Sequence, residues 1–269
     1  MSDIEEKRMY ADRREETVAY VASAEGVATV RLSGDRIGRF GLERRCHARD
    51  VATHDGRVYA ATETGVLAGE GFESLSFDRP AVAVAAGDAG VFAADETGAV
   101  CRYRDGTWTD VGTVGDVRAL SGALVAADAG VFRVHGDEVV DVGLSDVRDV
   151  AAAGVPLAAT GDGLYRLGNG WLCERDGPLG MVAAAGDGDR AHAATGETLS
   201  VHGEDGWTAV DLPVTDLVAD VAYGECVYAV TAAGTVLVAA DPDRTADGAG
   251  GWRSRSLGLS DVAAVAVVQ

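Results

Sequence analysis

The sequence predicts an all-β fold, a seven-bladed β-propeller with four-stranded blades. Three observations lead to this fold class. A strand-turn-strand pattern recurs seven times along the chain, and turns that contain glycine recur with it. The last strand of the chain is left over after the seventh copy.

The repeat consists of a short apolar strand that ends in small residues, a tight turn and a second apolar strand. Val58–Thr62 before Gly65 and Val91–Asp95 before Gly98 are typical copies. The turn lies at positions 26, 65, 98, 130, 163, 198 and 234, so the mean period is about 35 residues. A period in this range is typical of repeat architectures.

Each period also holds two further strands, which leaves no room for a helix. Asp105-Gly106, Asn169-Gly170 and Asp205-Gly206 mark the turn before the outermost strand. These dipeptides favour tight hairpins because both turn residues need positive φ. A Val- and Ala-rich strand completes the unit, as in Asp146–Ala151. Four strands per repeat predict the blades of a propeller, and we number the strands of a blade from the channel outward.

The two ends of the chain predict how the ring closes. Thr17–Ser23 matches the second strand of the other copies, whereas Asp261–Val268 matches a first strand. The C-terminal strand therefore completes the first blade, which gives a single propeller domain over residues 17–269. Residues 1–16 precede it as a charged N-terminal tail. Two stacked β-sandwiches would explain neither the phased repeat nor the missing first strand.

The composition argues against several classes of protein. The 269 residues carry a net charge of −20, with 43 acidic against 23 basic residues, and Lys7 is the only lysine. Such a surface repels phosphate backbones and anionic lipids, so we expect neither nucleic-acid nor membrane binding. Since no stretch suits a membrane helix or a signal peptide, we expect a cytoplasmic protein. Acidic excess with almost no lysine indicates salt adaptation and predicts a halophilic archaeon as the source.

Alignment of the copies assigns the conspicuous aromatic residues to the core. The four tryptophans share one position at the start of the fourth strand, as packing between blades requires; they are Trp108, Trp171, Trp207 and Trp252. His192 stands where other copies carry an aromatic or aliphatic residue, which predicts a buried histidine.

The cysteines do not indicate a metal site. Their spacing matches no zinc-binding pattern, so we expect reduced thiols in a cytoplasmic protein. Cys46 and His47 adjoin in a loop at the expected channel mouth and form the one pair to watch for thiol chemistry. A neighbour in the sequence, however, supplies neither a base in space nor a lowered pKa.

One set of charges is phased with the blades and forms the candidate site. Aspartates stand near the start of five of the seven channel-lining strands; they are Asp50, Asp116, Asp146, Asp216 and Asp261. Arg118 and Arg148 share the position two residues after their aspartates, and Asp149 and Asp220 lie deeper in the channel. Carboxylates of the turns between second and third strands, such as Glu25 and Glu197, face the same end. The expected result is an acidic funnel at the channel mouth.

The phased aspartates allow two interpretations. In the structural one, each carboxylate accepts hydrogen bonds from turn N–H groups and fixes the connection between blades. In the functional one, the funnel binds a cation in the central channel or a basic ligand, because a concave surface of one sign focuses the electric field. Both hold if some aspartates are structural and the others are exposed.

A resemblance to a known family rests on the stretches Glu6–Arg13, Thr17–Ser23 and Arg45–Ala52. They are similar to an uncharacterised haloarchaeal family of seven-bladed β-propellers, along the whole chain. This resemblance implies the fold and brings no catalytic residues. The Asp/Asn-Gly-Trp turns also resemble degenerate Asp-box or photosystem-assembly-type repeats. The Ser-x-Asp of a complete Asp-box is missing, so sialidase-like chemistry is not implied.

No catalytic motif accompanies the repeat. The sequence lacks a G-x-S-x-G elbow, a P-loop, an H-E-x-x-H motif and a Rossmann fingerprint. We therefore favour a non-enzymatic scaffold that binds other proteins through its top face or blade edges and needs no cofactor. The alternative is a metal- or small-ligand-binding propeller, such as a hydrolase or lyase, that uses the acidic funnel. Only His47 and His54 lie near that funnel, so a multi-histidine metal site is hard to build.

Overall fold

The structure is a computed structural model that describes residues 16–186, 190–196, 198–203, 205–239 and 251–268. The predicted N-terminal tail, residues 1–16, lies outside these ranges except for Glu16. Among the described residues, none belongs to a helix that is long and apolar enough to cross a membrane.

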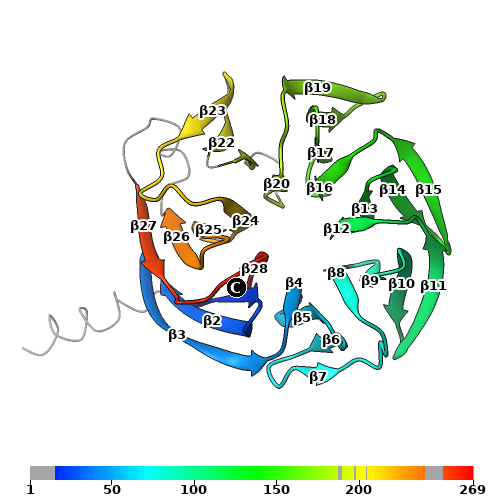
Figure 1. The fold of residues 1–269 in the computed structure, drawn as a ribbon, viewed down its shortest axis with the longest axis horizontal. Helices are drawn as coiled ribbons and strands as arrows, with labels where there is room; N and C mark the ends of the chain where they lie inside the picture. Colours follow the sequence, from blue (N-terminus) through cyan, green and yellow to red (C-terminus); the bar gives the residue numbers. More distant parts are fainter. Residues whose placement is uncertain (1–15, 187–189, 197, 204, 240–250, 269) are drawn as a thin grey trace, which may run out of the picture.

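Seven sheets form a ring around a central channel, as Figure 1 shows. In the described residues 28 strands make up seven four-stranded antiparallel sheets, and there is no helix. The predicted seven-bladed β-propeller is therefore confirmed.

The blades follow one another around the ring in chain order, and the strands of each blade run from the innermost to the outermost. Blade one is β28 (Ala264–Val268), β1 (Thr17–Ser23), β2 (Gly26–Ser33) and β3 (Arg36–Arg45); blade two is β4 (Ala48–His54), β5 (Arg57–Thr62), β6 (Gly65–Ala68) and β7 (Glu73–Ser74); blade three is β8 (Ala81–Gly87), β9 (Gly90–Asp95), β10 (Ala99–Arg104) and β11 (Thr107–Thr113); blade four is β12 (Val117–Ser121), β13 (Leu124–Ala127), β14 (Gly130–His135) and β15 (Glu138–Gly143); blade five is β16 (Val147–Ala151), β17 (Leu157–Thr160), β18 (Gly163–Leu167) and β19 (Trp171–Asp176); blade six is β20 (Met181–Ala184), β21 (Ala191–Thr195), β22 (Thr198–Gly203) and β23 (Gly206–Val210); blade seven is β24 (Val218–Tyr223), β25 (Val227–Thr231), β26 (Thr235–Ala239) and β27 (Trp252–Ser256).

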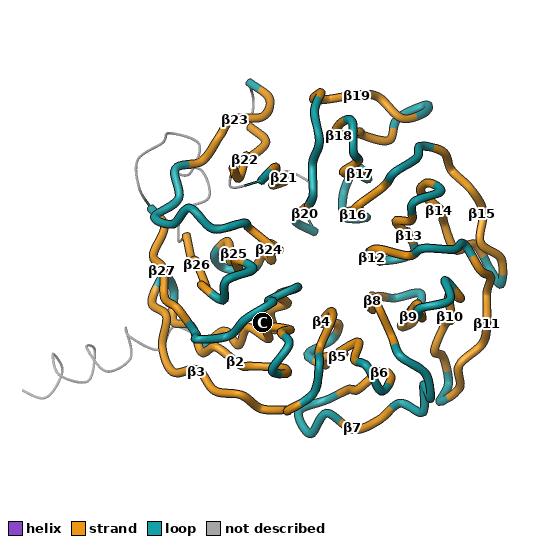
Figure 2. Tube along the Cα trace, in the orientation of Figure 1, coloured by secondary structure: helices purple, strands orange, loops and turns teal. Residues whose placement is uncertain are grey.

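The ring closes through the two ends of the chain, as the sequence predicts. The C-terminal strand β28 pairs antiparallel with β1, from Val18 opposite Val268 to Ala22 opposite Ala264. Figure 2 shows how a loop carries the chain from the outer strand of one blade to the inner strand of the next. Blade one is thus built from the first and last strands of the fold.

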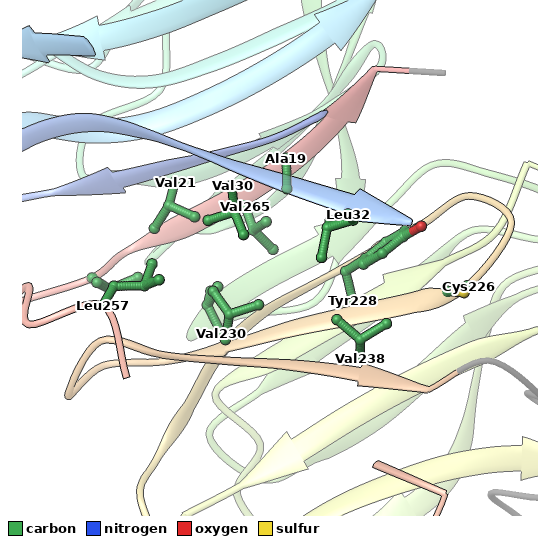
Figure 3. Packing of buried hydrophobic residues seen from close by; sticks show 12 residues of the cluster. Ala19, Val21, Val30, Leu32, Cys226, Tyr228, Val230, Val238, Leu257 and Val265 are labelled. Carbon is green, nitrogen blue, oxygen red and sulfur yellow. The ribbon is translucent and has the colours of Figure 1, made fainter. Parts of the chain in front are cut away.

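The hydrophobic core lies between blades, because each sheet buries both of its faces against its neighbours. Figure 3 shows the cluster at the closure, where Val21 and Leu32 of blade one pack near Tyr228 and Val238 of blade seven. Tyr228 is only 1% exposed. Burial of these side chains therefore stabilises the closed ring rather than any single blade.

The tryptophans pack between blades, as predicted. The indole Nε1 of Trp108 in blade three donates to Leu75 O of blade two at 2.8 Å. That of Trp171 in blade five donates to Val142 O of blade four at the same distance. Trp207 and Trp252 join the clusters of the following interfaces. An aromatic ring that fills one blade junction after another is a core residue and not part of a binding cage.

His192 is a core residue, as its place in the repeat predicts. Its side chain is fully buried in β21, and its Nδ1 lies 2.8 Å from the Tyr223 hydroxyl, which donates to Ala183 O at 3.1 Å. Burial lowers the pKa of His192 to about 4. The imidazole is therefore neutral near pH 7.

The repeated turn glycine has a steric cause. At Gly26, where φ is +139°, a Cβ would lie 1.9 Å from the carbonyl oxygen of Arg44. At Gly234, where φ is +83°, it would lie 2.3 Å from the carbonyl oxygen of Leu259. The end of the outer strand β3 in blade one, and the chain that follows β27 in blade seven, pass directly against the turn. Side chains of these turns and of the blade-to-blade loops therefore share one end of the ring, the top face.

Candidate functional site

The inner strands of the seven blades line a central cavity of about 440 Å³. Most of its wall consists of small apolar side chains, chiefly alanine and valine. Charged side chains come from blades two, four, five and seven; they are Asp50, Asp149 and Asp220 together with Arg49, Arg118 and Arg148. Small apolar residues are therefore the most numerous along the wall, but the surface that faces the cavity is mostly polar and carries charges of both signs.

Three aspartates share one position in the channel wall. Asp50, Asp149 and Asp220 are each the third residue of an inner strand, β4, β16 and β24, and each precedes a valine. In all three strands the pairing with the second strand shifts just before the aspartate, as it does at a β-bulge. We call these residues the ring aspartates.

Each ring aspartate joins two blades through backbone hydrogen bonds. One carboxylate oxygen accepts the N–H of the following valine at 2.7–2.8 Å. The other accepts an N–H from the inner strand of the next blade at 2.8 Å; the donors are Val84 to Asp50, Val182 to Asp149 and Val265 to Asp220. The ring aspartates therefore fasten blade two to three, five to six and seven to one.

The ring aspartates hold their protons more strongly than ordinary aspartates do. Burial raises the pKa of Asp50 to about 7 and that of Asp149 to about 6, and it raises the pKa of Asp220 well above its usual value. Repulsion by Asp149 adds to the rise at Asp50 and Asp220, while the backbone hydrogen bonds oppose it. Near pH 7 the ring therefore carries fewer than three negative charges.

A second group of charges, around Arg118, lies at the channel mouth on the top face. The Arg118 guanidinium contacts Asp146 Oδ1 at 2.6 Å, Asp128 Oδ1 at 2.7 Å and Asp116 Oδ2 at 3.7 Å. Arg148 Nη2 lies 3.6 Å from the other oxygen of Asp146. The hydrogen bond from Arg118 holds the pKa of Asp146 below its usual value. The mouth of blades four and five is therefore a network of ion pairs.

The five predicted aspartates do not share a single position. Asp116 and Asp146 stand directly before the first residue of β12 and β16, and Asp261 has the equivalent place before β28. Relative to the position that Asp146 occupies in blade five, Asp50 lies three residues later in blade two and Asp216 lies one residue earlier in blade seven. The sequence alignment matched the first aspartate of each segment, whereas the bulge sets the register of the strands.

Asp216 and Asp261 lie at the top face and are exposed. Asp146 and Asp261 both adopt φ of +47°, in the left-handed region that aspartate tolerates better than most residues. Backbone conformation therefore gives a structural reason for an aspartate at these two loop positions.

Three described turn carboxylates, Glu25, Glu63 and Glu96, bond with residues of the loops at the top face. Glu25 accepts hydrogen bonds from Ser260 Oγ at 2.6 Å and Ser260 N at 3.1 Å. Glu63 accepts the N–H of His47 at 2.6 Å, and Glu96 pairs with Arg49 at 2.7 Å. Glu197 lies outside the described residues. The expected acidic funnel is thus in large part a set of contacts that anchor the loops.

The geometry of Cys46 and His47 does not suit a reactive thiol. Burial and the charge of Glu63 raise the pKa of Cys46, opposite to what a nucleophile needs. Cys46 Sγ donates a long hydrogen bond to Arg44 O, at 4.0 Å, and has no imidazole as its partner there. His47 is exposed and uses its backbone N–H to bind Glu63.

Nor do the side chains near the channel gather as metal ligands do. Throughout the described ranges, no three His, Cys, Asp or Glu side chains are close enough to share a metal ion. The ring aspartates direct both carboxylate oxygens at backbone N–H groups. The channel charges thus form bonds within the protein before any ligand is considered.

Sequence reasoning placed Asp149 and Asp220 in the channel but did not equate them with Asp50. The triplet Asp-Val-Ala carries part of that signal, because it recurs at 50–52, 149–151 and 220–222, but it also occurs at 261–263, where Asp261 lies at the mouth. Arg49 was missed altogether, although it precedes Asp50 as Arg148 precedes Asp149. Alignment on the triplet would have matched Arg49 with Arg148, but only the strand register separates Asp261 from the ring aspartates.

Comparisons with known structures identify the fold. A protein from Lactobacillus plantarum aligns with a TM-score of 0.68 and 14% identity over 94% of this chain and 99% of that chain. A functionally unknown protein from Desulfotomaculum acetoxidans aligns with the same TM-score and 10% identity over the same shares. The WD40 β-propeller domain of Doa1 aligns with a TM-score of 0.61 and 11% identity over 83% of this chain and 86% of that chain. At such identities the likeness concerns the fold alone.

Sequence comparison identifies the family. No curated protein matches the chain. The model of the HVO_0234-like beta-propeller family matches residues 3–268, which is nearly the whole length. The chain therefore belongs to the HVO_0234-like β-propeller family.

Proposed function

We propose that this propeller is a non-enzymatic scaffold that binds other proteins through its top face or its blade edges. The observation that carries the proposal is the use of the channel charges. The ring aspartates fasten blade to blade, and Arg118 pairs with Asp128 and Asp146. Chemistry in the channel would need groups that are not already bonded, whereas the rim of the disc presents free strand edges.

The setting we propose is the salt-rich cytoplasm of a halophilic archaeon. A net charge of −20 with a single lysine supports this setting, since high salt screens the self-repulsion of an acidic surface. A ring in which buried contacts and backbone bonds join the blades also suits high salt. Such contacts are screened far less than exposed ion pairs.

Affinity capture from a salt-rich lysate tests the scaffold. The bait is the full chain, and a matched bait carries Asp216→Ala and Asp261→Asn, which remove two exposed charges of the top face. We expect a reproducible partner with the first bait. Retention by the second bait assigns it to the blade edges, and loss assigns it to the top face. Recovery of no reproducible partner would contradict the proposal.

A second candidate is a small-ligand- or cation-binding propeller, and the central cavity is the observation that favours it. Its volume of about 440 Å³ would admit a small molecule, and its wall carries both Asp and Arg. Thermal shift against divalent metals tests this candidate in the wild type, Asp146→Asn and Asp216→Ala. A metal that stabilises the wild type and neither variant would support it. The absence of any metal-dependent shift in the wild type would count against the cation.

A further inference from the structure

The outer strands divide the rim of the disc into a basic and an acidic part. β3 and β27 lie side by side where the ring closes (Figure 1). They carry one carboxylate, Glu43, and six exposed arginines, which are Arg36, Arg39, Arg44, Arg45, Arg253 and Arg255. The other five outer strands carry six carboxylates and a single arginine, Arg175. We call β3 and β27 together the basic arc.

Two arginines of the basic arc hold blades seven and one together. Arg255 Nη1 donates to Gly38 O at 2.8 Å and to Ile37 O at 3.2 Å, and its guanidinium lies 4.9 Å from the Phe40 ring centre. Arg253 Nε contacts Asp35 at 2.6 Å. These contacts explain the positive charge on β27.

The arginines of β3 have no comparable role. Within the described part of the chain, no ion pair joins Arg36, Arg39, Arg44 or Arg45 to a carboxylate. All four are exposed, on a molecule whose net charge is −20. Among the described residues, these four arginines form the largest group of positive charges on the rim that no ion pair joins to a carboxylate.

The same strand presents a free backbone edge. β3 has 10 residues, which makes it the longest strand of the described structure, and only β2 pairs with it. Arg255 covers the carbonyls of Ile37 and Gly38, and no strand of the described residues pairs with the outer edge of Arg39–Arg45. Gly41 adds no side chain to this edge, and Phe40 is 38% exposed. An edge of this kind can pair with a further strand.

We propose that Arg39–Arg45 of β3 binds an extended acidic segment of a partner protein, which adds a fifth strand to blade one. This inference rests on the proposed scaffold function and names the surface and the chemistry of its partner. Arginines on an edge strand repel basic chains, which protects the edge against unspecific pairing. The same charges attract an acidic chain, and the uncovered N–H and C=O groups bond its backbone.

The observations favour a polypeptide over a single-stranded nucleic acid. Nucleic-acid grooves combine basic residues with several aromatic platforms on which bases stack. The basic arc offers one exposed aromatic ring, Phe40, and it lies 4.9 Å from the Arg255 guanidinium. A free strand edge, in contrast, is matched by another strand.

The test measures binding of a synthetic peptide of alternating glutamate and valine to the full-length protein, by fluorescence anisotropy. A lysine-valine peptide and an oligothymidylate serve as comparison probes. The variant is Arg39→Gln/Arg44→Gln/Arg45→Gln. The matched control is Arg57→Gln/Arg104→Gln/Arg133→Gln, three exposed arginines of other blades, so that the net charge changes equally.

We expect the glutamate-valine peptide to bind the wild type and the control alike. Binding to the β3 variant should be weaker by about tenfold, since each lost surface charge pair contributes a fraction of a kcal/mol. Bound peptide should also slow hydrogen exchange of amides within Arg39–Arg45 and leave the other outer strands unchanged. This second readout separates strand addition from simple charge attraction.

Four results would overturn the proposal. They are absence of peptide binding, equal loss in both triple variants, tighter binding of the oligothymidylate, and amides of Arg39–Arg45 that are already protected without peptide. The scaffold itself is judged separately. If the β3 variant still captures the lysate partner of the wild type, this edge is not the binding surface and the scaffold function stands.

Discussion

Asp146 and Asp149 lie three residues apart at the start of blade five, and their pKa values are displaced in opposite directions. Asp149 faces the channel, where burial raises its pKa to about 6 against two backbone hydrogen bonds. Asp146 lies at the mouth, where the hydrogen bond from Arg118 lowers its pKa. The environment of each carboxylate therefore decides its behaviour, although both are phased with the repeat.

The two carboxylates also differ in what they bond. The ring aspartates bind main-chain N–H groups of two blades, so they hold neighbouring blades together. The mouth aspartates bind arginine side chains that are themselves partly exposed, so they act on local loops. We expect substitutions of the ring aspartates to lower the free energy of unfolding of the whole propeller. Substitutions of the mouth aspartates should change it only slightly and in a salt-dependent way.

The largest effect is expected for Asp149→Ala. The change leaves the N–H groups of Val150 and Val182 without their acceptors, and each unpaired buried donor costs about 1–3 kcal/mol. Removal of a poorly solvated carboxylate returns part of that cost, so we expect a net loss of about 2 kcal/mol in the free energy of unfolding. Denaturant unfolding measures it. Stability equal to that of the wild type would show that the bond between blades five and six is dispensable.

The pH dependence of stability distinguishes the ring aspartates from the mouth aspartates. Between the usual pKa of 3.8 and about 7, folded Asp50 binds more protons than the unfolded chain does. Its contribution to the free energy of unfolding is therefore fully present below about pH 4 and is lost as the pH rises through about 7. Mouth residue Asp146 has a lowered pKa, so its contribution is lost only as the pH falls below about 4.

Asp50→Asn is the variant that isolates this dependence. His192 has the opposite effect in the same window, because its pKa of about 4 when folded destabilises the fold as the pH falls below 6.5. The difference between wild type and variant cancels this contribution. We expect the stability of the wild type, relative to Asp50→Asn, to decrease from pH 4 to pH 7. A constant or increasing difference in thermal unfolding across that range would contradict a raised pKa at Asp50.

A smaller effect is expected for Arg118→Gln at the mouth. Its partners Asp116, Asp128 and Asp146 are about half to three quarters exposed, and exposed ion pairs contribute about 0–1 kcal/mol. We expect a loss of at most about 1 kcal/mol in dilute buffer that shrinks in molar salt, where screening extends only about 3 Å. The loss for Asp149→Ala should persist in molar salt. Equal salt dependence of the two variants would contradict the distinction between the ring aspartates and the mouth aspartates.

The fold was predictable because residues close together in the sequence form the repeated pattern of strands and turns. The turn glycine at positions such as 26 and 234 leaves no room for a side chain, and six of the seven copies carry it, with Thr198 in its place in the sixth. The strands Thr17–Ser23 and Asp261–Val268 each matched a different place in the repeat, which was enough to predict the closure.

The site was less predictable, because a β-bulge shifts the register of the inner strands. In blade five both Asp146 and Asp149 are candidates for a repeated aspartate, and only the bond from Val182 shows which one joins the blades. The basic arc was not anticipated either. Its strands β3 and β27 are far apart in the sequence, and the closure of the ring brings them together.

The smallest effect is expected for Asp216→Ala. Asp216 is exposed, precedes β24 by two residues and lies one position away from the place that Asp146 occupies in blade five. Exposed positions without special backbone geometry change stability by less than about 0.5 kcal/mol when substituted. Denaturant unfolding beside Asp149→Ala makes the comparison direct. A loss as large as that of Asp149→Ala would mean that a place in the repeat, and not burial with backbone bonds, makes an aspartate structural in this propeller.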